Sequence, residues 1–481
     1  MLIFNLSRPG RAAEAQLPDA ALEPTDIPAE LLRHSKPLLP EVSELDAVRH
    51  YTRLSQKNFS IDTRFYPLGS CTMKYNPKAC HTLASLPEFQ NVHPAALERA
   101  GQGTLACLFD LQEILKEVTG MAGVSLASAA GAQGEFAGVA MIRAYNRQRG
   151  DTARTEMLVP AAAHGTNPAS AAMGGFTVRE LPTDARGNVD VEALRAAVGP
   201  ATAGIMLTNP STLGVFEQNI QAIAEVVHGA GGLLYYDGAN LNAILGKVRP
   251  GDMGFDVIHL NLNKTFSTPH GGGGPGAGPV GVGETLLPFL PLPVVAREGE
   301  HYRLLGESDR PLSIGRLMGY AGNIGVLLRA YVYARMLGKE GMRRVAEIAT
   351  LNANYLRGKL VDAGFEPAFP ERRAAHEFIL TLKTLAKERH ATALDVAKRL
   401  LDYGFHAPTV YFPLLIPECL LIEPTETESK ETLDAFAAAM AAILKEAEAE
   451  PETLKAAPTT LPVRRLDEVN AARHPDLAYR A

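Results

Sequence analysis

Four polar segments of the chain carry side chains that could do chemistry, and each follows an apolar run that predicts a strand. Three of them hold Asp237, Lys264 and His164, and the fourth, Ser128–Gly134, is a run of small residues that opens a helix. Each has an ordinary explanation when it is taken alone. An aspartate often caps a helix, a lysine after a strand usually faces solvent, and a loop histidine is usually structural. None of the four decides the function by itself.

As a set, the four segments meet the needs of one cofactor, pyridoxal phosphate. This cofactor requires a lysine for a Schiff base and an acid beside its pyridine nitrogen. Its phosphate suits a helix N-terminus with free backbone N–H groups. A carboxylate about 4 Å from a pyridinium contributes roughly 4 kcal/mol at an effective dielectric near 20, before desolvation is subtracted. We therefore predict that Lys264 forms the Schiff base and that Asp237 faces the ring nitrogen.

The segment after Lys264 contains four consecutive glycines, Gly271–Gly274. A flexible linker would mix serine with glycine between polar flanks. Here an apolar strand-like run precedes the lysine, and a second apolar run, Pro279–Val282, follows the glycines. Glycine allows backbone conformations and close approaches that other residues forbid. The run predicts that the backbone passes close to the cofactor.

Strands alternating with helices must position these groups between residues 100 and 290. Helical spacing of apolar residues separates the runs, and this alternation predicts a mostly parallel sheet with right-handed crossovers. In such sheets ligands bind outside the carboxyl ends of the strands, where the four polar segments lie. The predicted strands are Met157–Pro160, Phe176–Leu181, Gly204–Thr208, Gly232–Tyr236 and Val257–Leu262.

Three zones are predicted along the chain. Residues 1–90 form a proline-rich arm with short helices such as Glu44–Leu54, residues 91–325 form the large cofactor domain, and residues 326–481 form a small α+β domain and tail. The tail after Pro451 is predicted to be extended. In the small domain the predicted helices are Ile324–Leu337, Glu340–Gly358, Ala391–Leu401 and Lys430–Ala449, and the predicted strands are Phe378–Leu382 and Cys419–Ile422.

The composition excludes several classes of protein. The 481 residues are 46% hydrophobic and 21% charged, which is too apolar for a disordered chain. With 47 basic and 53 acidic residues the net charge is −6 and no basic run stands out, which argues against nucleic-acid binding. No apolar run has the length of a membrane span, and the N-terminus lacks the pattern of a signal peptide. Four cysteines without a C-x-x-C pair fit a reducing cytosol, so we expect a cytoplasmic protein.

Four motifs carry a resemblance to a known family: Pro67–Pro77 (PLGSCTMKYNP), Ala163–Pro168 (AHGTNP), Tyr236–Asn242 (YDGANLN) and the lysine–polyglycine stretch. In this order they resemble the pyridoxal-phosphate-dependent glycine decarboxylase of the glycine cleavage system, the P-protein. The resemblance is closest to subunit 2 of its two-subunit form. It implies the aspartate aminotransferase-like fold, fold type I, with a large mixed, mostly parallel sheet and a small C-terminal domain.

The resemblance also implies a reaction and the residues that carry it. Glycine would lose its carboxylate as carbon dioxide, and the aminomethyl group would pass to the lipoyl group of the H-protein. Lys264 and His164 are the implied catalytic residues. The implied cofactor-binding residues are Lys264, Asp237, His164, Gly131, Ala132, Gln133, Thr166 and Ala239. Asn76 and Asn240 are expected near the substrate, and no metal is expected.

Expected partners are subunit 1, the lipoylated H-protein and glycine, in a hetero-oligomer with two copies of each subunit. Two residues depart from the family pattern, since many members have histidine at Asn263 and cysteine at Ser267. Neither change removes a group that the reaction requires. Cys71, Lys74 and Tyr75 stand in the Pro67–Pro77 motif and are expected to line the site, without a catalytic role for the thiol.

Other functions remain open at this point. One is another fold-type I enzyme, such as an amino-acid decarboxylase or a cysteine desulfurase. A desulfurase needs a nucleophilic cysteine in a late mobile loop, whereas Cys419 lies in an apolar run. A catalytically silent scaffold subunit would lack Lys264. A nucleotide-binding α/β protein is disfavoured because Ser128–Gly134 has neither standard phosphate-loop spacing.

Overall fold

The structure is a computed structural model that describes residues 1–11, 27–35, 37–270 and 276–478. The chain forms two compact units. The smaller comprises Met1–Ser60 and Leu461–Val463, and the larger comprises Ile61–Thr460 and Arg464–Ala481. The predicted close approach at Gly271–Gly274 lies outside the described residues. The division of the chain at residues 90 and 325 stays a prediction.

The smaller unit is built around one helix, α1 (Glu44–Ser55), which confirms the predicted helix in the arm. The Ser43 hydroxyl caps it by accepting a hydrogen bond from Asp46 N. Two short 3-10 turns, η1 (Ile3–Leu6) and η3 (Ala29–Leu31), belong to the same unit.

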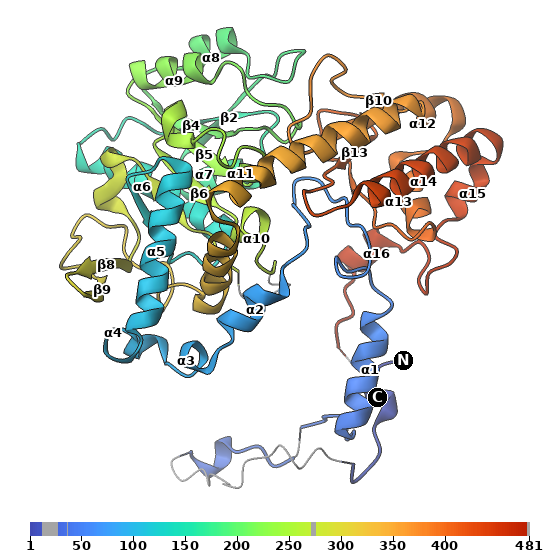
Figure 1. Ribbon diagram of the computed structural model, residues 1–481, viewed down its shortest axis with the longest axis horizontal. Coiled ribbons are helices and arrows are strands. Elements are labelled where there is room, and N and C mark those ends of the chain that lie inside the picture. Colours follow the sequence, from blue (N-terminus) through green and yellow to red (C-terminus); the bar gives the residue numbers. More distant parts are fainter. Residues whose placement is uncertain (12–26, 36, 271–275, 479–481) are drawn as a thin grey trace. The chain divides into compact units, whose positions relative to one another are not determined.

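A seven-stranded sheet forms the centre of the larger unit, in the order β1-β7-β6-β5-β4-β2-β3 (Figure 1). The pairs β2–β3, β2–β4, β4–β5 and β5–β6 are parallel, whereas β7 pairs antiparallel with β1 and β6. The sheet is thus mixed and mostly parallel, as predicted. The strands are β1 (Gly123–Ser125), β2 (Glu156–Pro160), β3 (Thr177–Leu181), β4 (Thr202–Thr208), β5 (Leu233–Gly238), β6 (Val257–Leu260) and β7 (Val280–Val282).

Helices cover both faces of this sheet. Along β5 the side chains alternate, so that Leu234 and Tyr236 enter one core while Leu233 and Tyr235 enter the other. Because both faces are covered, every residue of β4 and β5 is buried. On one face lie α5 (Gln102–Thr119), α8 (Val191–Ala197), α9 (Ile220–Gly229) and the start of α11, and on the other lie α6 (Gly131–Gln148) and α7 (Thr166–Met173).

The long helix α11 (Ile324–Asp362) extends from the large sheet to the smaller one (Figure 1). Its first part packs in the core with α5, and its last turns pack against α14 (Lys430–Ala449). The helix breaks at Gly338, where φ is 60° and ψ is −173°. This conformation suits glycine, and it separates the two helices that the sequence predicts here.

The smaller sheet is antiparallel, in the order β10-β11-β13-β12. Phe378 of β11 (Phe378–Thr381) pairs with Ile422 of β13 (Cys419–Ile422), and both strands were predicted. The other elements of the larger unit are β10 (Glu366–Pro367), β12 (Thr409–Val410), β8 (Val294–Glu298), β9 (His301–Leu305), α2 (Lys78–Ala84), α3 (Pro87–Gln90), α4 (Leu97–Ala100), α10 (Leu262–Thr265), α12 (Lys383–Arg389), α13 (Ala393–Asp402), η4 (Pro94–Ala96), η5 (Leu241–Ala243), η6 (Pro250–Met253) and η7 (Glu284–Phe289).

The prediction of an extended tail after Pro451 is wrong, because two short helices form there. Helix α15 (Pro451–Ala456) starts with proline at its first position, where the missing N–H costs nothing. Helix α16 (Glu468–Arg473) is capped by Asp467, whose side chain accepts a hydrogen bond from Asn470 N. Among the helices that the structure describes, none has both the length and the apolar character needed to cross a membrane.

A largely buried ion pair joins distant parts of the larger unit. Lys74 Nζ lies 2.6 Å from Glu426 Oε1, and neither side chain is more than 8% exposed. The same ammonium donates to Asn242 Oδ1, to the Thr265 carbonyl and to the Tyr333 hydroxyl, at 2.9–3.2 Å. The pair therefore fixes the Pro67–Pro77 motif against the large sheet, α11 and the smaller sheet.

Replacing Lys74 with methionine is expected to lower the free energy of unfolding by about 3–5 kcal/mol, because Glu426 would remain buried without its cation. Urea denaturation measures the change. The matched control is Lys78→Met, whose ion pair with Asp62 is largely exposed and contributes little. Equal losses in the two variants would contradict a special role for the buried pair.

Candidate active site

The two residues predicted to bind the cofactor most directly lie at the same edge of the large sheet. Asp237 is near the carboxyl end of β5, and Lys264 lies in α10, just after β6. The parallel register pairs Asp237 of β5 with His259 of β6, so the segments that follow these two strands leave the sheet side by side. Lys264 Nζ donates to the Ser70 carbonyl at 2.9 Å, which brings the Pro67–Pro77 motif to this edge.

Asp237 is held by a network that sequence reasoning missed. His259 Nε2 lies 3.3 Å from Asp237 Oδ1, while its Nδ1 is hydrogen-bonded to the Tyr235 hydroxyl. Burial lowers the pKa of His259, so the neutral ring accepts from the tyrosine and points its proton at the carboxylate. Ala239 N donates to the same Asp237 oxygen at 3.0 Å, and the Asn167 amide donates to the other. The carboxylate is therefore fixed and only 3% exposed.

His164 lies in the loop between β2 and α7, half-buried. Its Nδ1 accepts from Thr166 N at 3.2 Å and lies 2.9 Å from Thr166 Oγ1. The ring meets Phe412 edge to face, with centroids 5.4 Å apart. Burial lowers the pKa of His164, while Asp237 opposes that shift and Lys264 adds to it. A neutral ring held in one orientation by Thr166 is suited to stacking on a flat ligand.

The backbone around the start of α6 is closely packed, and two glycines there, Gly131 and Gly278, leave no room for a side chain. A Cβ on Gly131 would lie 1.9 Å from Asn261 Nδ2, and one on Gly278 would lie 2.0 Å from the Ala130 carbonyl oxygen. The Gln133 side chain braces the loop, because its Oε1 accepts from Ala129 N at 2.6 Å and its Nε2 donates to the Leu317 carbonyl at 3.0 Å. Both of its polar atoms are thus already bonded within the chain.

The groups left without partners fit a phosphate. Within the described part of the chain, the N–H groups of Gly131 and Ala132 have no hydrogen-bond acceptor, and they open α6. The Ser128 hydroxyl, in the loop just before this helix, is also buried and has no partner among the described residues. Donors at a helix N-terminus and an unpaired hydroxyl are what an anionic group requires. Together with Lys264 and Asp237, these residues fit pyridoxal phosphate.

The two residues predicted near the substrate are engaged in holding loops beside Lys264. Asn76 Nδ2 donates to the Ser267 carbonyl at 2.8 Å and to its hydroxyl at 3.1 Å. Asn240 Nδ2 donates to the Pro210 carbonyl at 2.9 Å. Ser267 and Asn263, the two departures from the family pattern, also have hydrogen-bond partners. Ser267 Oγ donates to the Tyr75 carbonyl. Asn263 Nδ2 lies 3.2 Å from His270 Nδ1.

A carboxyl group, Glu135 on α6, has an oxygen within 4.8 Å of one oxygen of Asp237 and is only 2% exposed. Burial, reinforced by the charge of Asp237, raises its pKa to about 7. A carboxyl whose pKa is higher in the folded than in the unfolded protein stabilises the fold at low pH, and this contribution is lost as pH rises through the folded pKa.

We therefore expect the free energy of unfolding to fall between about pH 4.5 and pH 7, by up to about 3 kcal/mol from this group. Glu135→Gln should lack this part of the decline, so the variant gains stability relative to the parent at pH 8 but not at pH 4. Urea denaturation at both pH values measures the difference. An equal offset at the two pH values would contradict a raised pKa.

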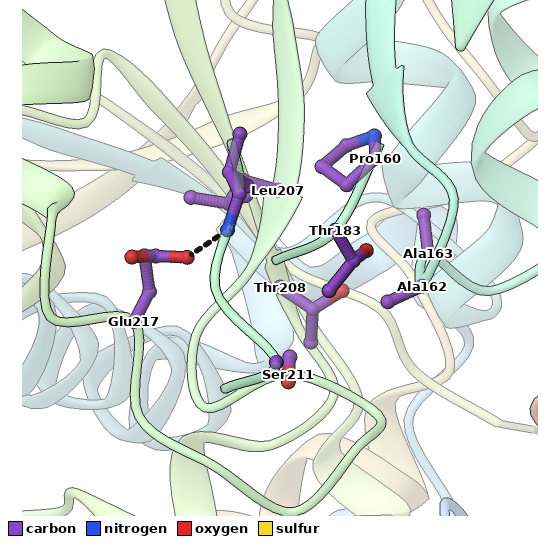
Figure 2. Close-up of a pocket in the computed structure, with 10 residues that line it drawn as sticks. Pro160, Ala162, Ala163, Thr183, Leu207, Thr208, Ser211 and Glu217 are labelled. Atoms are coloured by element: carbon purple, nitrogen blue, oxygen red, sulfur yellow. Dashed lines mark hydrogen bonds between the residues drawn. The ribbon is translucent and has the colours of Figure 1, made fainter. Parts of the chain in front are cut away.

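A separate small cavity of about 20 Å³ lies between the ends of β2 and β4 (Figure 2). The hydroxyls of Thr183 and Thr208 line it, and both are buried without a partner in the part of the chain that the structure describes. Glu217 lies at its rim and accepts a hydrogen bond from Val189 N at 2.7 Å. This volume holds about one water molecule, which would satisfy the two hydroxyls, and it is too small for a cofactor.

Known proteins resemble this chain over its whole length. The family described as "Glycine cleavage system P-protein" matches residues 19–296, and the one described as "Glycine dehydrogenase, C-terminal domain" matches residues 345–461. "Probable glycine dehydrogenase (decarboxylating) subunit 2" of Methylococcus capsulatus is 73% identical over 100% of this chain and 98% of the relative. The protein of the same description in Thiobacillus denitrificans is 70% identical, over 100% and 99%.

Solved structures share the fold. The crystal structure of glycine decarboxylase (P-protein) of the glycine cleavage system, in inhibitor-bound form, aligns with a TM-score of 0.73 at 23% identity, over 87% of this chain and 93% of that one. An aspartate aminotransferase from Thermus thermophilus aligns with a TM-score of 0.58 at 15% identity, over 79% and 99%. These likenesses confirm the predicted fold class. With a family match over more than half of its length, this chain belongs to the glycine cleavage system P-protein family.

Proposed function

We propose that this chain is the lysine-bearing subunit of a pyridoxal-phosphate-dependent glycine dehydrogenase (decarboxylating), with Lys264 as the cofactor's covalent anchor. The enzyme class agrees with the description of full-length relatives at 70–73% identity, and the cofactor agrees with the P-protein family to which the chain belongs. The observation that carries the proposal is that Lys264 and the buried Asp237 follow neighbouring strands at one sheet edge, in a larger unit where the N–H groups that open α6 have no acceptor among the described residues.

Pyridoxal phosphate, when bound, accepts the electron pair that glycine retains as its carboxylate leaves. Asp237 would hold the pyridine nitrogen in its protonated form, and His259 and Ala239 N hold that carboxylate in place. His164 would lie against the ring, oriented by Thr166. The N–H groups of Gly131 and Ala132 would bind the phosphate, and Gln133 would keep their loop rigid. Asn76 and Asn240 would position the loops that face the substrate.

The aminomethyl group would then pass to the lipoyl group of the H-protein, whose disulfide takes up two electrons. The relatives are described as "subunit 2", which supports a partner subunit 1. We propose an assembly with two copies of each subunit, located in the cytoplasm. Neither nucleic acid nor a membrane is needed as a partner.

Two rival functions lose support in the structure. A cysteine desulfurase needs a mobile cysteine, whereas Cys419 is fully buried in β13. A catalytically silent scaffold needs no lysine beside a buried aspartate, yet Lys264 and Asp237 are both present.

A substrate panel tests the proposal. The full-length chain, subunit 1 and the lipoylated carrier are incubated in turn with glycine, aspartate, glutamate and cysteine, and the release of carbon dioxide and sulfide is measured. Release of carbon dioxide from glycine alone is expected. Preferred decarboxylation of another amino acid, or sulfide from cysteine, would overturn the proposal in favour of another fold-type I activity.

A further inference from the structure

Three titratable side chains are fully buried at the end of the smaller sheet, on the side of Lys264. Glu377 directly precedes β11 and Glu423 directly follows β13, so the register that pairs Phe378 with Ile422 places the two glutamates opposite one another. His376 joins them, and all three are 0% exposed. One ligand atom from each lies within 4.8 Å of the others. Nothing in the proposed reaction described above uses them.

The two carboxyl groups hold a strained turn. Glu377 Oε2 accepts from Ser70 N at 2.6 Å, and Glu423 Oε2 accepts from Thr72 N at 3.0 Å. Ser70 and Thr72 both have positive φ values, 61° and 46°, which are unfavourable for residues with a side chain. The carbonyl of Ser70 accepts from Lys264 Nζ. The glutamates are therefore linked to the lysine through one turn.

The charges around this cluster do not balance if both glutamates are ionised. The groups that face it are Lys264, Lys74, Glu426, Cys71 and His376. Lys74 is already paired with Glu426, and burial lowers the pKa of His376 to about 3, so that ring is neutral. Burial raises the pKa of the Cys71 thiol, which is therefore also neutral. Two carboxyl groups thus face a single cation, Lys264.

One oxygen of the pair lacks a donor. Within the described residues, Glu423 Oε1 is buried without a hydrogen bond, and the nearest His376 nitrogen is 3.7 Å away. The two oxygens of Glu377 accept from Ser70 N and, at 3.4 Å, from Asn240 Nδ2. One oxygen of Glu377 lies within 4.8 Å of one oxygen of Glu423, so a single proton on the pair would relieve the repulsion between two carboxylates. Burial, reinforced by Glu423, raises the pKa of Glu377 well above its usual value, whereas burial raises the pKa of Glu423 to about 7. Glu377 is accordingly the partner that keeps the proton.

We propose that Glu377 and Glu423 share one proton and act as positioning residues for Lys264. The pair carries one negative charge, holds the Ser70–Thr72 turn, and thereby orients the lysine amine and sets the pH at which the lysine-bound cofactor titrates. This inference rests on the proposed role of Lys264. It adds a function for the smaller domain, which would position a lysine that follows a strand of the large sheet.

The test is a pH titration of the near-visible absorbance of the cofactor-loaded full-length chain with subunit 1. Glu377→Gln mimics the protonated carboxyl, since its carbonyl can still accept from Ser70 N and its amide carries no charge. This variant should titrate close to the parent. The double variant Glu377→Gln/Glu423→Gln loses the negative charge, so its midpoint should fall by roughly one pH unit.

Glu217→Gln is the matched control, because Glu217 is also a buried carboxylate that accepts two backbone N–H groups, from Val189 and Asn219. It should not move the midpoint. If the double variant is less stable but its absorbance titrates at the same midpoint as the parent, the two glutamates have only a structural role, and the proposal is overturned.

Two further results would also overturn it. If Glu377→Gln alone lowers the midpoint by about half the shift of the double variant, both carboxyl groups are ionised in the parent and no proton is shared. If a chelator shifts the parent's midpoint, a metal ion balances the pair in place of a proton. Failure of this proposal can be told apart from failure of the proposed function. The absorbance of the parent titrates whether or not glycine is the substrate.

Discussion

Lys264→Ala is expected to lose the near-visible absorbance of the bound cofactor and to lower decarboxylation on the order of 10⁴-fold or more. The reason is that the amine serves two purposes in the proposed site. It anchors the cofactor covalently, and it is the only basic side chain that the structure places on the Ser70 turn at this sheet edge, within the described residues. Without it, the cofactor would be held without a covalent link, by the α6 N-terminus, Asp237 and His164.

Absorbance spectra and borohydride reduction check this prediction. Reduction should add the mass of the cofactor to a peptide that contains Lys264 in the parent and to no peptide in the variant. Lys264→Arg is the informative control, because it keeps a cation beside the buried glutamates but offers no amine for the linkage. If the alanine variant binds the cofactor and turns over as the parent does, Lys264 is not the anchor.

Asp237→Asn is expected to keep the cofactor yet reduce the turnover rate by roughly a thousandfold, which corresponds to the loss of about 4 kcal/mol of attraction between the carboxylate and a ring cation. Asparagine can still accept from Ala239 N, so the loop should be preserved. Only the negative charge that keeps the ring nitrogen protonated is removed.

The control for this variant is Asp256→Asn. Asp256 lies at the opposite end of the same strands, where it accepts from Leu234 N at 2.7 Å and pairs with His228. It should affect stability alone. Turnover measured at saturating glycine, with the cofactor content of each variant determined from its spectrum, separates catalysis from binding. Unchanged turnover in Asp237→Asn would contradict its role as partner of the ring nitrogen.

The large sheet could be predicted because its strands are short, apolar and followed at once by polar residues. Every strand from β2 to β6 starts within two residues of its predicted start, and Asp237 and Lys264 both lie at the predicted edge. The rule that parallel strands share one carboxyl edge is enough to bring these two together. This prediction of the sheet edge required no knowledge of contacts between distant segments.

The network behind Asp237 was missed for a different reason. His259 is one polar residue in an otherwise apolar strand, and a polar side chain in a doubly covered strand requires a buried partner. That signal is visible in the sequence. Its partner is not, because only the register of β5 against β6 shows that His259 lies beside Asp237.

Glu377 and Glu423 were missed because nothing local links them. They are separated by 46 positions, and each flanks a predicted strand as an ordinary boundary residue would. Their opposition depends on the antiparallel register of β11 and β13, and their contact with Ser70 and Thr72 depends on the Pro67–Pro77 motif reaching the same sheet. Local sequence patterns do not specify contacts of this range.

The central claim is that this chain supplies the lysine on which glycine decarboxylation depends, and isotope exchange tests it most directly. Carboxyl-labelled glycine is mixed with the chain, subunit 1, pyridoxal phosphate and the lipoylated carrier, and the transfer of label to bicarbonate is followed. Label should exchange with the parent chain and fall to background with Lys264→Ala. Exchange that persists in the Lys264→Ala mixture, or no exchange with a parent chain that carries its full complement of cofactor, would contradict the claim.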